Sequence, residues 1–252
     1  MVHFVGAGPG AVDLITVRGM KLIGEADVII YAGSLVNPEL LSYKKDSAQV
    51  HNSALMTLDE VIEVMKEAHS ADKDIVRLHT GEPSIYGAVR EQMDRLDELG
   101  ISYDSTPGVS ACFGAASALN IEYTLPSQSQ TLIITRMEGK TPVPTNESIE
   151  TLASHGASMA IYLSSGMLEE LTRRLIAGGY KEDTPAAIVY KATWPDQMCL
   201  TGTLKDIPSL GREHGINRLA VVLVGAAVLH KDYDLSRLYA DDYTTGYRKA
   251  KV

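Results

Sequence analysis

The chain has 252 residues, 45% of them hydrophobic and 22% charged, which is the composition of a globular protein with a substantial buried core. Its 23 Lys and Arg against 32 Asp and Glu give a net charge of −9. This balance argues against nucleic acid as the main partner, although a local cluster of cations can still bind a small anion.

Seven short apolar runs predict β-strands, at residues 2–5, 28–31, 75–79, 132–135, 159–163, 186–190 and 220–224. Their apolar residues are consecutive rather than alternate, which indicates strands covered on both faces, as in α/β sheets. Helices are predicted at residues 58–68, 88–99 and 168–176. Thr57 and Glu60 have the spacing of a capping box before the first helix, and Gly100 follows the second as a C-cap.

The polar stretch LPSQSQ at residues 125–130 divides these elements into two nearly equal halves. We expect it to be a linker between an N-terminal α/β domain at residues 1–126 and a C-terminal α/β domain at residues 127–252. An ordinary loop inside one domain is the alternative. A second polar stretch, GKTPVPTNES at residues 139–148, predicts a long surface or functional loop.

The two cysteines, Cys112 and Cys199, are far apart and form no CxxC pair. This pattern favours a reducing compartment. No signal peptide is recognisable, and no apolar run approaches the ~20 residues of a membrane-spanning helix. The protein is therefore expected in the cytoplasm. The seven histidines are scattered, without an HExxH or Cys/His spacing, so no metal site is expected.

The first glycine turn, GAGPGAVDLIT, has the position of a phosphate-binding loop but not its spacing. A dinucleotide fingerprint is GxGxxG with an acidic residue after the second strand. Here Gly6, Gly8 and Gly10 are one residue too close at the last step, and the second predicted strand ends at Tyr31. Pro9 also removes a backbone donor. We interpret the stretch as a rigid turn rather than a phosphate loop.

Two further stretches follow predicted strands. LHTGEPSIYGA at residues 78–88 combines small residues, the carboxylate of Glu82 and the ring of Tyr86, which suits a nucleoside; a βα turn in which Glu82 only caps a helix is the alternative. TPGVSACFGAASALN at residues 106–120 is a helix start with little side-chain bulk. Its GVSAC segment lacks the last glycine of a GxSxG elbow, so neither Ser110 nor Cys112 is favoured as a nucleophile.

Together these stretches resemble the tetrapyrrole methyltransferases, which use S-adenosylmethionine to methylate the macrocycle on the routes to sirohaem and cobalamin. The matching motifs are GAGPGAVDLIT, TGEPSIYGA and TPGVSACFGAASAL, and MAIYLS, AAIVYKATWPDQ and RLAVVLVGAAV extend the likeness over the whole chain. IYAGSLVN and HTGEPSIYGAVREQM look most like the branch that methylates C11 of precorrin-4 or cobalt-precorrin-4. The chain departs from the family where Ala11 replaces an aspartate after GPG and where Glu82 replaces the aspartate of a Gly-Asp-Pro turn.

The resemblance implies two α/β domains with a cofactor cleft between them (the tetrapyrrole methylase-like, class III methyltransferase fold) and a homodimer. It implies that S-adenosylmethionine, and its product S-adenosylhomocysteine, bind residues carried over by motif: Pro9, Thr80, Gly81, Glu82, Ile85, Tyr86, Ala111, Cys112, Leu163, Lys191, Ala192 and Ala220. Substrate-binding candidates are the turn glycines and four cations: Gly8, Gly10, Arg18, Arg90, Arg136 and Lys140.

The implied reaction is an in-line displacement in which C11 attacks the sulfonium methyl. Such chemistry depends on holding two reactants close and in line. No residue is assigned as a catalytic base. Methylation of another tetrapyrrole carbon is the main alternative, followed by methylases of the same fold that act on ribosomal RNA or on a modified histidine. A nicotinamide-dependent oxidoreductase and a non-enzymatic cofactor-binding protein are the remaining alternatives.

Overall fold

The computed structural model describes residues 1–229, 231 and 233–251. They form two compact units, each built on one five-stranded sheet. The first unit contains Met1–Ala118 together with Lys191–Gln197, and the second contains Leu119–Tyr190 and the described residues from Met198 onward. No helix in the described part of the chain has the length and apolar character needed to cross a membrane.

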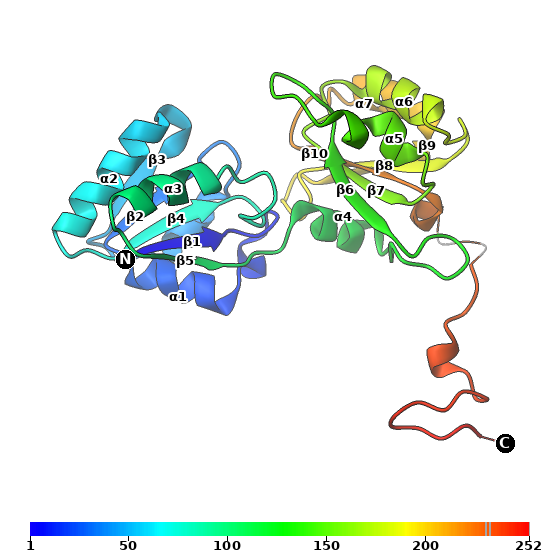
Figure 1. The fold of residues 1–252 in the computed structure, drawn as a ribbon, viewed down its shortest axis with the longest axis horizontal. Helices are drawn as coiled ribbons and strands as arrows, with labels where there is room; N and C mark the ends of the chain where they lie inside the picture. The colour runs from blue at the N-terminus through cyan, green and yellow to red at the C-terminus, as the bar shows by residue number, and fades with distance from the viewer. Residues whose placement is uncertain (230, 232, 252) are drawn as a thin grey trace. The chain divides into compact units, whose positions relative to one another are not determined.

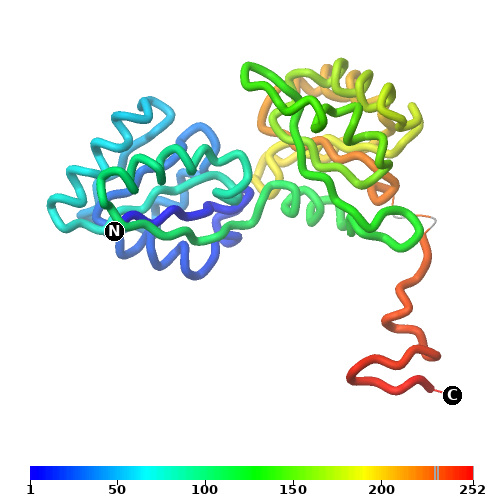
Figure 2. Tube along the Cα trace, viewed as in Figure 1, coloured from blue at the N-terminus to red at the C-terminus, as the bar shows by residue number. Residues whose placement is uncertain are grey.

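The first sheet is wholly parallel, with strand order β3-β2-β4-β1-β5. Its strands are β1 (Val2–Gly6), β2 (Val28–Tyr31), β3 (Gln49–Asn52), β4 (Ile75–His79) and β5 (Tyr103–Thr106). The helices that accompany them are α1 (Val17–Glu25), α2 (Leu58–Ser70), α3 (Arg90–Glu98) and α4 (Ala111–Leu119). The chain can be followed through these crossings from blue to green in Figure 2.

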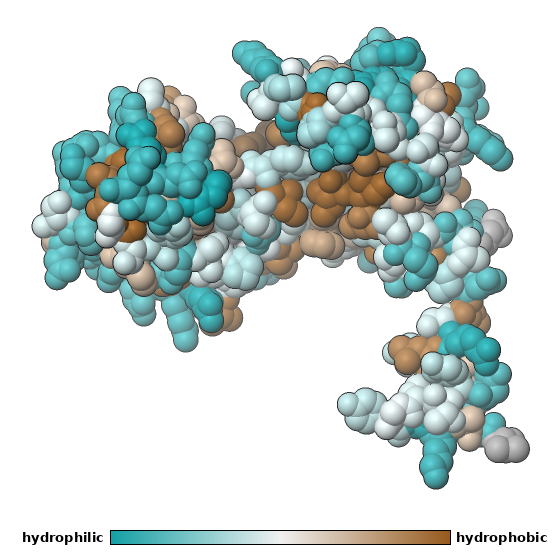
Figure 3. All heavy atoms as spheres, viewed as in Figure 1, coloured by the Kyte–Doolittle hydropathy of each residue, from teal (hydrophilic) through white to brown (hydrophobic). Residues whose placement is uncertain are grey.

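Each face of this sheet has its own core. Helices α2 and α3 cover one face, where Met65 and Leu96 pack against Phe4, and α1 covers the other, where Ile23 packs against Val5 (Figure 1). Hydrophilic side chains predominate on the visible outer surface of this unit (Figure 3), as expected for amphipathic helices. Because all five strands are parallel, their carboxyl ends meet at one edge, where ligands bind in open α/β sheets.

The second sheet is mixed, with strand order β6-β7-β10-β8-β9. Its strands are β6 (Leu132–Arg136), β7 (Ser158–Tyr162), β8 (Pro185–Tyr190), β9 (Met198–Thr203) and β10 (Ala220–Val224). Only β6 and β7 pair in parallel; β10 runs antiparallel to β7 and β8, and β9 antiparallel to β8. One core lies between this sheet and the helices α5 (Ile149–Ala153), α6 (Leu168–Ala177) and α7 (Ile207–Glu213).

The prediction of buried α/β strands is confirmed, since all seven predicted runs are strands, with shifts of one residue at some ends. The sequence missed β3, β5 and β9, which are the edge strands at three of the four sheet edges and carry mixed polar and apolar residues. The predicted capping box is also confirmed: the Thr57 side chain accepts from the Glu60 amide, and the Glu60 side chain accepts from the Thr57 amide.

Two segments differ from the expected domain organisation. The units divide between Ala118 and Leu119, not after residue 126, so LPSQSQ is part of the second unit rather than a linker. Leu125 is buried there, and the Ser129 hydroxyl accepts from the Ser158 amide at 3.0 Å. Residues 191–197 were expected in the C-terminal domain, but they pack with the first unit.

Candidate cofactor site

Three turns at the carboxyl edge of the first sheet are joined through glycine backbone. Gly8, after β1, and Gly81, after β4, form an isolated antiparallel bridge. The Gly81 amide donates to the Gly8 carbonyl at 3.0 Å, and the Gly8 amide to the Gly81 carbonyl at 3.3 Å. Both glycines have left-handed backbone, with φ of +79° and +60°. This conformation and this pairing explain why glycine is required at both positions.

Gly6 and Gly108 bring a third turn, the one after β5, into the same contact. A Cβ atom at Gly6 would lie 2.5 Å from the Gly108 amide nitrogen and 2.6 Å from the Gly81 carbonyl oxygen. Because backbone meets backbone here, no side chain can move aside to admit a Cβ. Two of the glycines that looked like a phosphate loop, Gly6 and Gly8, therefore serve close packing of the three turns.

Glu82 connects two of these turns through its carboxylate. One oxygen accepts from the Ser84 amide at 3.0 Å, and the other from the Gly108 amide at 2.8 Å. Partial burial by itself would raise the pKa of Glu82, but the hydrogen bonds from Ser84 and Gly108 outweigh it and lower the pKa below its ordinary value. The carboxylate thus holds the 80–84 turn against the 107–110 turn.

Residues 191–197 lie against the first glycine turn, 185 residues earlier in the chain. The indole N–H of Trp194 donates to the Pro9 carbonyl at 3.2 Å, and the Ala11 amide donates to the Thr193 hydroxyl at 2.9 Å. A Cβ at Gly10 would overlap the Trp194 ring. These contacts explain why the segment belongs to the first unit. The family resemblance leads one to expect an aspartate at position 11. Ala11 contacts the 191–197 segment through its backbone amide instead.

Lys191 and Ala192 begin this segment. The Lys191 ammonium pairs with Asp196 at 2.6 Å and lies 5.5 Å from the centre of the Trp194 ring, while Ala192 is buried. The structure therefore brings these two candidates to the same unit as Pro9, Thr80 and Glu82.

Three residues that fix the first turn were not found by sequence reasoning: Asn37, Thr193 and Trp194. Asn37 is buried and donates to the Gly10 carbonyl at 2.9 Å. Asn37 and Trp194 lie in stretches, IYAGSLVN and AAIVYKATWPDQ, that the family resemblance had already marked. What the sequence lacked was the pairing of these stretches with residues 9–11, which is a long-range contact.

The turn after β4 has the features of a ligand site. The hydroxyl oxygen of Thr80 is buried and, within the described residues, has no hydrogen-bond partner. Buried hydroxyls nearly always form a hydrogen bond, so a polar ligand atom at this edge of the sheet would supply the partner that Thr80 lacks. Gly81 carries no side chain beside this hydroxyl, and an added Cβ would lie in ordinary contact with its neighbours, the nearest atom being 3.7 Å away. Tyr86 has φ +54° and is 45% exposed. The turn thus fits a nucleoside-type cofactor.

The remaining first-unit candidates extend this surface or lie beneath it. The Ile85 amide donates to the Glu82 carbonyl at 3.2 Å and closes the turn. Ala111 starts α4, and Cys112 behind it is completely buried. A Cβ at Gly114 would lie 2.8 Å from the Cβ of Pro9, so α4 packs directly on the first turn.

The four candidate cations differ in what they contact. Arg90 is engaged by Asp94 at 2.7 Å and Asp97 at 2.9 Å. The Arg136 guanidinium donates to three backbone carbonyls of its own loop, those of Met137, Thr141 and Pro142. Arg18 and Lys140 are exposed, and neither forms an ion pair within the described residues.

The second unit carries the other candidates. Leu163 follows β7 with φ +53° and is 65% exposed, whereas Ala220 is buried and belongs to the core beneath the sheet. Among the described residues, no three His, Cys, Asp or Glu side chains gather as a metal site would require.

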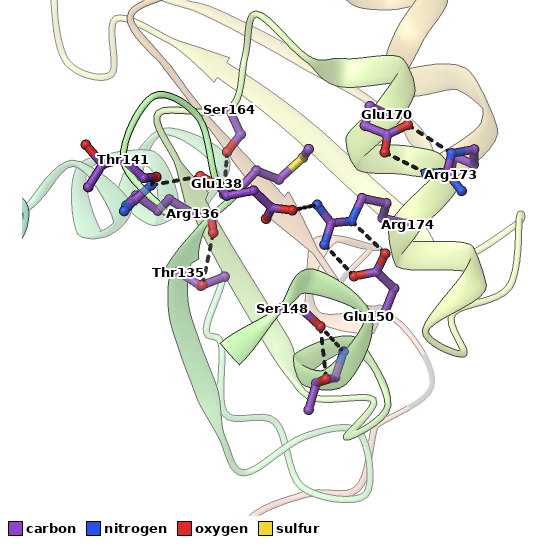
Figure 4. Close-up of polar contacts among 12 residues, drawn as sticks. Thr135, Arg136, Glu138, Thr141, Ser148, Glu150, Ser164, Glu170, Arg173 and Arg174 are labelled. Atoms are coloured by element: carbon purple, nitrogen blue, oxygen red, sulfur yellow. Dashed lines mark hydrogen bonds and ion pairs between the residues drawn. The ribbon is translucent and has the colours of Figure 1, made fainter. Parts of the chain in front are cut away.

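The loop that carries Lys140 is fixed by an ion cluster (Figure 4). Arg174 of α6, mostly buried, donates to both oxygens of Glu150 at 2.6 Å and also contacts Glu138. The hydrogen bonds from Arg174 lower the pKa of Glu150 to about 2, although partial burial opposes this. A hollow of about 570 Å³ lies beside the cluster, lined by Lys140, Pro142, Thr145 and Arg174 among others.

A second hollow, of about 560 Å³, lies between α6 and α7 and is lined by Met167, Glu170, Pro208 and Arg212 among others. It contains none of the residues that the sequence singled out. Volume alone therefore does not identify the site, and the orphaned hydroxyl and the joined turns of the first unit are better guides.

Comparison with known proteins places this geometry in a family. Residues 1–208 match the family model described as Tetrapyrrole (Corrin/Porphyrin) Methylases. The cobalt-precorrin-4 C(11)-methyltransferase of Methanocaldococcus jannaschii is 50% identical over 249 residues, covering 99% of this chain and 96% of that protein. The precorrin-4 C(11)-methyltransferase of Sinorhizobium sp is 43% identical over 248 residues, covering 98% of each.

Solved structures give the same result. The X-ray structure of a cobalamin biosynthetic enzyme, cobalt precorrin-4 methyltransferase, superposes with a TM-score of 0.88 at 43% identity, covering 90% of this chain and 95% of that one. Uroporphyrin-III C-methyltransferase of Thermus thermophilus, crystallised with S-adenosylhomocysteine, shares the fold at a TM-score of 0.76 and 20% identity, covering 90% and 98%. The motifs, the fold and the full-length relatives agree: the chain belongs to the tetrapyrrole (corrin/porphyrin) methylase family.

Proposed function

We propose that this protein transfers a methyl group from S-adenosylmethionine to C11 of precorrin-4 or cobalt-precorrin-4 in cobalamin biosynthesis. The observation that carries the proposal is the 50% identity to a cobalt-precorrin-4 C(11)-methyltransferase over 99% of the chain. Relatives named for the metal-free substrate are 43% and 42% identical, so both substrates belong to the proposal.

The cofactor is assigned to the carboxyl edge of the first sheet. Bound there, S-adenosylmethionine supplies an electrophilic methyl group on a positively charged sulfur. Within the described residues the Thr80 hydroxyl has no hydrogen-bond partner, and Gly81 presents backbone rather than a side chain to the ligand. Glu82 holds the turn against Gly108. Leu163, exposed after β7, and Ala220, buried in the core of the second unit, complete the proposed set.

The chain's contribution to the reaction is positioning. A carbon–carbon bond forms between C11 and the methyl group while the carbon–sulfur bond breaks, and its electron pair stays on sulfur. Turns joined backbone to backbone, with Trp194 against Pro9, give a rigid site that holds the reactants close and in line. The substrate carboxylates are assigned to Arg18 and Lys140, since Arg90 and Arg136 are occupied by neighbouring groups.

A homodimer in the cytoplasm completes the proposal. The dimer rests on the family resemblance, and the compartment on two cysteines that form no disulfide, one of them fully buried. Light scattering during gel filtration measures the dimer: a mass of 27.2 kDa would refute it, and twice that mass would support it.

Two experiments test the activity. Titration calorimetry with S-adenosylhomocysteine and with NADH separates a methyltransferase from an oxidoreductase, and binding of NADH alone would overturn the proposal. Incubation with labelled S-adenosylmethionine and either metal-free or cobalt-loaded precorrin-4 then tests the position. Methyl label recovered at C11 supports the assignment, whereas label at another carbon refutes it. Comparison of the two substrates decides which one the enzyme uses.

A further inference from the structure

A buried arginine without an acidic partner lies directly under the proposed cofactor turn. Arg77, on the central strand β4, is 7% exposed, and no carboxylate of the described residues pairs with it. Burial lowers the pKa of Arg77 to about 10, and the group remains a cation at neutral pH. A buried cation is unfavourable unless its donors are satisfied, so its partners indicate why it is present.

The main side-chain partner of Arg77 is Gln92 of α3. The guanidinium Nε donates to Gln92 Oε1 at 3.0 Å, and Nη1 lies 3.3 Å from the carbonyl oxygen of Ile30. A guanidinium has only donors. It therefore forces the oxygen of the Gln92 amide toward Arg77 and the nitrogen away from it. Gln92 is itself buried, which leaves this orientation without competition from water.

The nitrogen of the same amide holds the end of the cofactor turn. Gln92 Nε2 donates to the carbonyl of Ala88 at 2.9 Å. Ala88 has φ +48° and Tyr86 has φ +54°, a left-handed backbone that is strained for residues other than glycine. Between them, a Cβ at Gly87 would overlap the Pro83 carbonyl, so the turn is tightly wound. Such a turn persists only when neighbouring groups hold it.

We propose that Gln92 and Arg77 are positioning residues for cofactor binding: Arg77 orients the Gln92 amide, and that amide locks the left-handed turn that presents Tyr86. The inference rests on the proposed function, because it assigns the 80–88 turn to S-adenosylmethionine. It explains why position 92 carries an amide, since an amide can accept from Arg77 and donate to Ala88 at once, whereas a carboxylate or an apolar side chain cannot.

The substitution Gln92→Glu separates the two bonds. A carboxylate still accepts from Arg77 but cannot donate to the Ala88 carbonyl. We expect Gln92→Glu to weaken S-adenosylhomocysteine binding by roughly three- to tenfold, the effect of one lost hydrogen bond. The KM for S-adenosylmethionine should rise while the KM for the tetrapyrrole is unchanged. Glu91→Gln, on the exposed adjacent position, is the matched control and should leave both unchanged.

A second substitution distinguishes positioning from general damage to the fold. In the Gln92→Glu background, Ala88→Gly removes the strain of the left-handed backbone and should recover part of the lost affinity. If Gln92→Glu does not fold, Gln92→Met with and without Ala88→Gly provides the same comparison. A folded Gln92 variant that binds S-adenosylhomocysteine within twofold of wild type would overturn the inference. Failure of the wild-type protein to bind it would instead overturn the proposed function.

Discussion

The indole ring of Trp194 covers Gly10, and its N–H donates to the carbonyl of Pro9 at 3.2 Å, 185 positions earlier in the chain. This contact joins the turn after β1 to a segment that leaves the second sheet after β8. It gives Gly10 a reason to be glycine that does not involve backbone freedom, because Gly10 does not adopt a left-handed φ. The lack of a side chain at Gly10 makes room for the ring.

Substitution of Gly10 tests this contact directly. Gly10→Ala should lower the free energy of unfolding by about 1–3 kcal/mol, because the new Cβ overlaps the indole ring. In a Trp194→Ala background the same change should cost almost nothing, since the overlapping atoms are gone. Urea unfolding of the four proteins, followed by circular dichroism, measures the coupling. Equal costs in both backgrounds would contradict the account.

Glu82→Ala should weaken binding of S-adenosylhomocysteine several-fold, as measured by calorimetry. The loss of the carboxylate leaves the Ser84 and Gly108 amides without their acceptor and releases one turn from the other. Glu82→Gln, which keeps one acceptor oxygen, should have an intermediate effect. A dissociation constant unchanged in Glu82→Ala would remove this residue from the cofactor site.

His79 should make the protein less stable as the pH falls below neutrality. Burial, together with the neighbouring Arg77, lowers the pKa of His79 to about 3, and its Nε2 has no partner within the described residues. Between pH 6.5 and 3 the unfolded chain therefore binds a proton that the folded chain does not. This contribution is fully present above pH 6.5 and is lost as the pH falls, at about 1.4 kcal/mol per pH unit.

The measurement is urea unfolding at pH 7, 6 and 5, a range in which most carboxylates remain ionised. His79→Leu should lose less stability over this range than wild type. Without His79, the unfolded chain binds one proton fewer on acidification, so the difference in bound protons between the unfolded and folded chains is smaller. Identical pH dependence of the two proteins would show that His79 is not held neutral.

Arg174→Met should destabilise the second unit by ~1–3 kcal/mol, because it leaves Glu138 and Glu150 without their shared cation. The lowered pKa of Glu150 implies that this stabilisation is present above pH 4.5 and is lost as the pH falls toward 2. Arg173→Met is the matched control, since the adjacent Arg173 is two-thirds exposed and, among the described residues, forms an ion pair with Glu170 alone at the surface. Thermal unfolding of both variants at pH 7 tests this, and comparable losses would refute the role of Arg174.

The sequence by itself determined the buried strands, because short runs of consecutive apolar residues such as those of β2 and β10 favour strands in a sheet that is covered on both faces. It also determined the family, through motifs at the ends of β1, β4 and β5. It did not give the edge strands β3, β5 and β9. Each of them pairs with one neighbouring strand only within its sheet, and their sequences mix polar and apolar residues instead of forming an apolar run. Nor did it give the division between units, because LPSQSQ reads as a linker although Leu125 is buried.

Tertiary structure decided what the motif residues do. Gly6, Gly81 and Gly108 meet only because three parallel strands end at one edge, and no local pattern encodes that meeting. The partners of Pro9 and Gly10, Trp194 and Asn37, come from distant positions in the chain. The sequence showed that the first turn lacks the spacing of a phosphate loop. Only the fold showed that its glycines make room for neighbouring backbone and for the indole ring of Trp194, because these contacts join residues that are far apart in the chain.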